Sequence, residues 1–225
     1  MSFNLSLQRL IYVVPAIIIA LTFHEYAHAR VSYALGDPTA KNAGRLTLNP
    51  LKHLDPVGAL LLIVMGFGWA KPVPINPNYY KGHKGHKMIL VSAAGPLMNL
   101  LEAVVGVGLI ALIYHLAVNH GAWFSSEFRY DLYTYAMNFL QYFAQINVVL
   151  MVFNLIPIPP LDGSKLITGL LPPSKMNVIL ALERYGFIVL AAFMLVPGLS
   201  NVLDKIIVLP AQWILSGLYS LFGLA

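Results

Sequence analysis

Residues 20–30, ALTFHEYAHAR, place two histidines and a glutamate at the end of a long apolar run. His24 and His28 are four positions apart, so on a helix both imidazoles lie on one face and can reach the same metal ion. Glu25 lies one step round the helix, where its carboxylate can face a water molecule at that metal. The alternative interpretation is a structural polar cluster at a helix end. Because ionisable groups inside an apolar segment are costly and usually functional, the pattern favours a metal site.

The composition is that of an integral membrane protein. The chain has 225 residues, of which 58% are hydrophobic and 10% are charged, and its mean hydropathy is +0.72. Such values exclude an ordinary soluble domain. Cysteine is absent, so a metal ion must be held by His, Asp or Glu. The net charge of +5 fits loops facing anionic lipids, and the lipid bilayer, not nucleic acid, is the expected partner.

The expected fold is an all-α polytopic membrane protein that forms one domain over residues 1–225. Its catalytic core covers about residues 8–170, and additional helices follow at about 177–224. Long apolar runs predict about five transmembrane helices. They cover residues 8–29, 88–118, 132–155, 177–196 and 203–224.

A shorter apolar run, residues 57–70, begins after the helix-start signal Asp55-Pro56. It has about 14 residues, too few for a full span, and we predict a re-entrant or interfacial segment. Residues 45–48 and 73–76 alternate in polarity, which predicts two short strands and thus a small membrane-associated β element. Basic residues flank both ends of the 57–70 run, so both flanks are expected at the cytoplasmic face.

A catalytic zinc site needs three protein ligands and one open position, so the two histidines require a partner from elsewhere. Asp162 follows a proline-rich stretch, IPIPPLDG, and could instead cap the helix after it. If residues 57–70 turn back, the span at 88–118 leaves the histidine side and the span at 132–155 returns to it. That topology brings Asp162 beside His24, and we predict it as the third ligand.

Two asparagines are candidate substrate-binding residues. Asn99 lies in AAGPLMNL, within a long apolar segment, and could bind substrate or join two helices. Asn154 begins the NLIPIPPLDG stretch. The remaining histidines, which show no ligand spacing, are expected at the surface or the membrane interface. They are His53, His83, His86, His115 and His120.

Several blocks together resemble the site-2 protease family of intramembrane zinc metalloproteases, in particular its short bacterial and archaeal members. They are HEYAHA, LGDPTAKNAGRLTLNPLKHLDP, FGWAKPVPINP, AAGPLMN and NLIPIPPLDG, and they cover most of the chain up to about residue 165. The resemblance implies one Zn²⁺ per chain, held by His24, His28 and Asp162, with Glu25 as the catalytic acid/base. No stretch resembles the PDZ or CBS domains that many relatives carry.

The expected function is hydrolysis of peptide bonds within or next to the transmembrane segments of membrane protein substrates. The active site would lie near the cytoplasmic face of the cell membrane. A further hypothesis is that substrate pairs, as an extended strand, with one of the two predicted strands. The alternative is an intramembrane metal-ion binding or transport protein, which explains the ligands but gives Glu25 no particular role.

Overall fold

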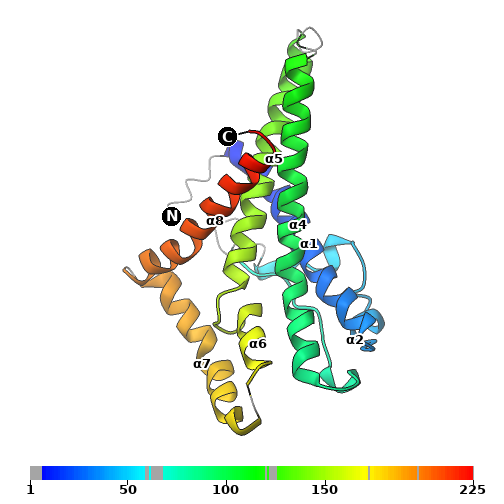
Figure 1. The fold of residues 1–225 in the computed structure, drawn as a ribbon, viewed down its shortest axis with the longest axis vertical. Helices are drawn as coiled ribbons and strands as arrows, with labels where there is room; N and C mark the ends of the chain where they lie inside the picture. Colours follow the sequence, from blue (N-terminus) through cyan, green and yellow to red (C-terminus); the bar gives the residue numbers. More distant parts are fainter. Residues whose placement is uncertain are drawn as a thin grey trace.

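Three long helices form the centre of the fold (Figure 1). The computed structural model describes residues 7–58, 61, 68–119, 121, 126–171, 173–196 and 198–224. Helices α1 (Leu7–Ala34), α4 (Lys84–Asn119) and α5 (Glu127–Asn154) pack against one another, and α4 with α5 forms a hairpin that projects beyond the rest. Prolines 15 and 96 lie inside α1 and α4. Neighbouring helices can satisfy the backbone groups that such prolines free.

Four helices in the described part of the chain are long and apolar enough to cross a membrane. They cover Arg9–Ala34, Lys84–Asn119, Glu127–Asn154 and Asn201–Leu221. The prediction of a helical, multi-pass membrane protein is therefore confirmed, and four of the about five expected spans are found among the described residues. The segment expected at 177–196 does form a helix, α7 (Met176–Leu195), but Glu183 and Arg184 lie exposed near its middle. Charged groups are costly at membrane depth.

The last two helices meet in a V beside the central bundle (Figure 1). Helix α8 (Leu199–Leu221) packs on α5 and α4 in an apolar cluster that contains Ala103, Val148, Met151 and Ala211. Helix α7 packs on the loop after α5 through Leu190, which clusters with Ile156, Leu161 and Leu203. This loop leads into the short helix α6 (Asp162–Thr168), so the C-terminal pair supports the segment that carries Asp162.

The predicted β element is wrong. The described residues contain no strand and only one isolated antiparallel bridge, between Leu54 and Ala70. In residues 45–48 burial does not alternate with polarity, since Arg45 is 6% exposed and Leu48 is 49% exposed, whereas Leu46 and Thr47 are both partly buried. Residues 73–76 contain Pro74 and lie between Pro72 and Pro77, and proline cannot donate ladder hydrogen bonds. Their neighbouring carbonyls are instead bound by the Arg45 guanidinium.

The predicted re-entrant segment, residues 57–70, lies mostly outside the described residues, which omit 59–60 and 62–67. Its two ends are nevertheless placed side by side. Leu54 pairs with Ala70, and the Lys71 N–H donates to the His53 carbonyl at 2.8 Å. The chain therefore comes back to the point where it left, as a segment that turns back requires.

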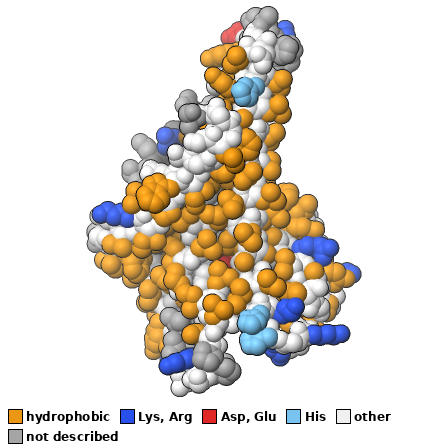
Figure 2. Space-filling view, viewed as in Figure 1, with side chains coloured by type: hydrophobic (Ala, Val, Ile, Leu, Met, Phe, Trp, Pro, Cys, Tyr) orange, Lys and Arg blue, Asp and Glu red, His pale blue; other side chains and the backbone are white. Residues whose placement is uncertain are grey.

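Hydrophobic side chains cover most of the visible surface (Figure 2). Several Lys and Arg side chains, with His beside them, gather at the lower right of that view, around the start of α4. An apolar belt with a basic rim at one end is the surface expected of a membrane protein.

Candidate metal centre

Two segments far apart in sequence bring three metal-ligating side chains together. His24 and His28 come from α1, and Asp162 is the first residue of α6. The Asp162 Oδ2 atom lies 3.2 Å from His24 Nε2 and 3.1 Å from His28 Nε2, and the two Nε2 atoms are 3.0 Å apart. All three residues are buried, at 5 to 7% exposed. In the described part of the chain, this is the group of His, Asp and Glu residues that could hold a metal ion.

The donor set fits zinc. Two imidazoles and one carboxylate are a common ligand set of catalytic zinc, with the fourth position open to water. Bonds of about 2.0–2.1 Å in a tetrahedral site separate the ligand atoms by about 3.3–3.4 Å. The observed separations of 3.0 to 3.2 Å form a triangle of nearly that size. The three side chains are thus arranged as a zinc site needs them.

The outer nitrogen of each histidine is also bound. His24 Nδ1 lies 2.6 Å from Asn99 Oδ1, and His28 Nδ1 lies 2.7 Å from the carbonyl oxygen of Val91. Both oxygens can only accept, so each Nδ1 carries the proton and each Nε2 keeps its lone pair for a metal. Helix α4 therefore fixes the tautomer and the ring orientation of both histidines.

Asp162 is not a helix cap. The N-cap position of α6 belongs to Leu161, and the Asp162 carboxylate turns toward the histidines. Gly163 allows this turn, since a Cβ there would lie 2.3 Å from the Leu155 carbonyl oxygen.

Helix α4 passes very close to His24 and His28 at Gly95. A Cβ atom on Gly95 would lie 2.4 Å from His28 Nε2 and 2.6 Å from His24 Nε2. Contacts under about 3 Å do not occur without displacement of one partner. Any side chain at this position would therefore fill the space between the nitrogens that a metal ion needs.

Glu25 is half-buried and contacts a different part of the chain. Its Oε2 atom accepts a hydrogen bond of 3.0 Å from the backbone N–H of Val73, in the proline-rich stretch before α4. Glu25 thus lies beside the first histidine in sequence, with one carboxylate oxygen fixed by backbone. This contact was not predicted from the sequence.

The two predicted substrate-binding asparagines are placed differently. Asn99 is fully buried; its Oδ1 accepts from His24 Nδ1, and its Nδ2 donates to Asn147 Oδ1 at 2.8 Å. Asn154 lies half-buried at the end of α5 and donates to the Leu150 carbonyl. Asn147, itself fully buried, was missed by the sequence reasoning, although a polar amide within the apolar α5 was a usable signal. A substrate role for Asn99 and Asn154 stays a prediction.

The other histidines do not join the site. His83, His86 and His115 are exposed as expected, and His120 lies outside the described residues. The expectation for His53 is wrong, because it is fully buried and its Nε2 lies 2.7 Å from the Thr47 carbonyl.

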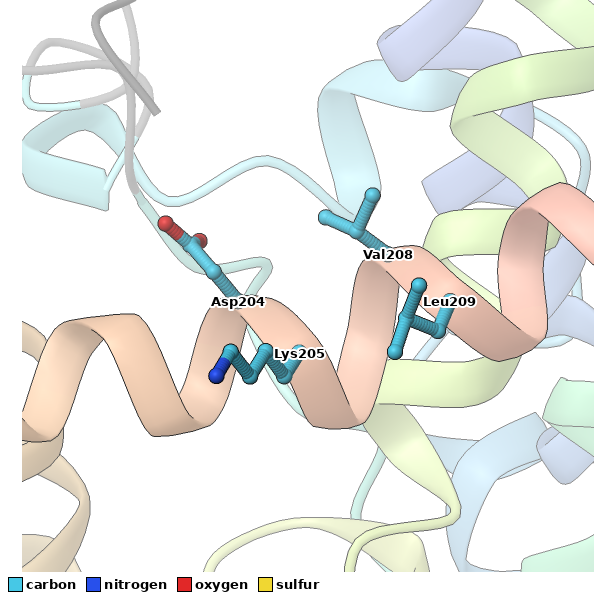
Figure 3. Close-up of a pocket in the computed structure, with 4 residues that line it drawn as sticks. All are labelled: Asp204, Lys205, Val208 and Leu209. Carbon is cyan, nitrogen blue, oxygen red and sulfur yellow. The ribbon is translucent and has the colours of Figure 1, made fainter.

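A hollow on the surface lies away from the metal centre. Its four lining residues, Asp204, Lys205, Val208 and Leu209, all come from α8 (Figure 3). None of the predicted ligands lines it. A hollow lined by one helix alone brings no convergent groups to a ligand, so we assign no chemistry to it.

A buried His–His–Asp group among membrane-length helices defines a membrane metalloprotein, and similarity to known proteins specifies its class. Residues 131–196 match the model of peptidase family M50. The chain is 43% identical over 192 residues to "Putative zinc metalloprotease YwhC" of Bacillus subtilis, covering 85% of this chain and 84% of that protein. It is 28% identical over 198 residues to "Putative zinc metalloprotease Rip2" of Mycolicibacterium smegmatis, covering 85% and 69%. No solved structure matches the chain.

The chain therefore belongs to peptidase family M50, the site-2 protease family. It is a zinc metalloprotease whose cofactor is Zn²⁺, as the resemblance of its sequence blocks implied.

Proposed function

We propose that this protein is an intramembrane zinc metalloprotease that hydrolyses peptide bonds within or next to transmembrane segments of membrane protein substrates. One observation carries the proposal: a buried His24–His28–Asp162 triangle lies within the membrane-length bundle, with Glu25 adjacent. His24 and His28 lie 10 and 6 residues before the end of α1, or about 15 and 9 Å along its axis. A peptide bond must enter the bundle to reach them.

Each residue has a distinct task in this proposal. His24, His28 and Asp162 hold the zinc ion, which, when bound, supplies Lewis-acid activation of water and of the scissile carbonyl. Glu25 takes a proton from the attacking water on its free oxygen and gives it to the leaving amine. Two neutral imidazoles and one carboxylate leave the site with net positive charge, which favours the negative charge that develops on the carbonyl oxygen. Asn154 is kept as a proposed substrate contact near Asp162.

We also propose that the site faces the cytoplasm in a cell membrane. Most basic residues lie around the end of α1 and the start of α4, namely Arg30, Lys41, Arg45, Lys52, Lys71, Lys81, Lys84 and Lys87. The opposite end of the α4–α5 hairpin has Arg129 beside Glu127 and Asp131. Excess positive charge marks the cytoplasmic side. The adjacent ends of the 57–70 segment support its proposed re-entrant path.

Labelling tests this orientation, because the native chain has no cysteine. Single cysteines at Lys52, Lys81 and Lys165 should react with an impermeant reagent from the cytoplasmic side. A cysteine at Asn119, the last residue of α4, should react from the other side. Reaction of Lys52 and Lys81 variants from opposite faces would contradict the proposal.

Proteolysis is tested with protein purified in detergent and a model transmembrane substrate. Cleavage should stop with a zinc chelator and return with added zinc. Glu25→Gln should abolish cleavage while zinc stays at about one per chain, whereas His24→Ala and Asp162→Ala should lose zinc as well. Retained cleavage in Glu25→Gln, or retained zinc in Asp162→Ala, would refute the assigned roles.

The transport alternative receives no support from the described residues. A permeation path needs successive binding groups across the membrane. The structure gives one such group in the part of the chain that it describes. The homologues are also named as metalloproteases.

A further inference from the structure

Arg45 is a buried cation that forms no salt bridge with the described residues. Its side chain is 6% exposed, and among the described residues the structure gives it no carboxylate within 4.0 Å. Its Nε atom is buried without a hydrogen-bond partner. Removing a guanidinium from water costs several kcal/mol unless compensated, so a chain does not bury one without a specific interaction to make.

Arg45 donates to two backbone carbonyls, and its Nη2 atom also lies 3.5 Å from His53 Nδ1. Nη2 donates to the carbonyl of Lys71 at 2.6 Å, and Nη1 donates to the carbonyl of Pro72 at 3.2 Å. The guanidinium fork suits two neighbouring acceptors, which a point-like ammonium cannot hold in the same way. Arg45 thus fixes the backbone immediately before Val73.

One peptide group connects this cation to Glu25. The peptide unit between Pro72 and Val73 has its C=O bound by Arg45 and its N–H bound to Glu25 Oε2. Because a peptide unit is planar, fixing the oxygen also fixes the direction of the N–H bond. A cation at the carbonyl polarises the unit and strengthens hydrogen bonding by its N–H to a carboxylate. Through this peptide, the positive charge of Arg45 strengthens the hydrogen bond that the Glu25 carboxylate accepts.

The other end of the stretch is held as well. The Asn76 N–H donates to the buried Asp37 carboxylate at 2.8 Å. Pro72 and Pro74 have fixed φ angles, which leaves few ways for residues 71–76 to rearrange. The peptide that binds Glu25 is accordingly held by hydrogen bonds on both sides in sequence and by the fixed φ angles of the flanking prolines.

We propose that Arg45 is a positioning residue for proteolysis, which holds the Pro72–Val73 peptide so that its N–H fixes one oxygen of Glu25 and leaves the other for water. The inference rests on the proposed function, in which Glu25 is the catalytic base. A displacement of about 1 Å at a reacting group can lower turnover by about 100-fold. Losing Arg45 should therefore affect kcat far more than KM.

The test is a double-mutant cycle on cleavage of a transmembrane substrate by the full chain. Arg45→Gln removes the cation, and Val73→Pro removes the N–H in a stretch that already tolerates proline. Each should lower kcat by about 10- to 100-fold with KM within about twofold and zinc at about one per chain. The kcat of the double variant should lie within about threefold of the kcat of Val73→Pro alone, because both substitutions disrupt the same Arg45–peptide–Glu25 connection.

Controls separate positioning from folding. Lys52→Gln removes an exposed basic charge near Arg45 and should keep wild-type kcat. Hydrogen exchange of residues 71–76 should accelerate at least about tenfold in Arg45→Gln. If Arg45→Gln does not fold, Arg45→Lys keeps the charge, and the same cycle is measured with it.

Multiplicative losses in the double variant would overturn the inference, as would unchanged kcat in Arg45→Gln. Equal loss of zinc and activity would also overturn it, since that outcome means a structural role. These results are distinct from failure of the proposed function. Active Glu25→Gln would refute the catalytic base, whereas inactive Glu25→Gln with multiplicative losses would refute the role of Arg45 alone.

Discussion

Replacing Asn99 with leucine should weaken zinc binding without changing any of the three proposed zinc ligands. Asn99 Oδ1 accepts from His24 Nδ1–H at 2.6 Å, and leucine of similar volume offers no acceptor. Residues that orient a ligating histidine typically contribute 10- to 100-fold to metal affinity. Asn99→Leu should therefore raise the zinc dissociation constant by that factor, or about 1.4 to 2.7 kcal/mol.

The same substitution should also destabilise the metal-free protein. It leaves two buried groups without their partners, the His24 Nδ1–H and the Asn147 Oδ1. Each unpaired buried group costs about 1 to 3 kcal/mol, so the metal-free protein should lose about 2 to 6 kcal/mol. Thermal unfolding in detergent, with and without zinc, measures this loss.

Asn147→Leu is the matched control. It removes the partner of Asn99 Nδ2 but leaves the bond to His24 intact. Stability should fall by less, and zinc affinity, measured by competition with a chromophoric chelator, should stay within about threefold. Asn99→Leu with wild-type zinc affinity would refute the reasoning. If KM rises while zinc binding is unchanged, Asn99 contacts substrate instead.

Two further predictions concern the surroundings of the site. Gly95→Ala should lower zinc affinity at least about tenfold, because its Cβ would lie 2.4 Å from His28 Nε2, although alanine alone favours a helix by about 1 kcal/mol. Gly217→Ala, where a Cβ meets nothing within 4 Å, should bind zinc normally, and equal behaviour of the two would contradict this. Asp37 is buried, but hydrogen bonds from Thr39, Asn76 and Ser32 outweigh burial and lower its pKa. Its contribution to stability is therefore present above its unfolded pKa of about 4 and is lost as pH falls through the lower folded value. Asp37→Asn should unfold at lower temperature at neutral pH and lose less on acidification below about pH 4, and identical pH profiles would count against it.

The sequence by itself was sufficient wherever the determining interactions are local or compositional. His24 and His28 share a helix face because four residues make about one turn, so their approach needs no distant contact. The apolar runs, similarly, identify membrane-length helices from the backbone's need for internal hydrogen bonds in lipid. Asp162 is 134 residues from His28, so it could be predicted as a partner only from an argument on topology and from a family resemblance.

Only the tertiary structure decided which polar groups become partners across the fold. Asn99 and His24 are 75 residues apart, and no periodicity links them. Residues 45–48 show the limit most clearly, since alternation predicted a strand, whereas the structure has no strand there and buries Arg45. The reason is that the buried Arg45 guanidinium needs hydrogen-bond acceptors, and it finds them in the Lys71 and Pro72 carbonyls, 26 and 27 residues away in the sequence. Which donors and acceptors pair in this way depends on the tertiary fold, and the polarity pattern of the sequence does not reveal it.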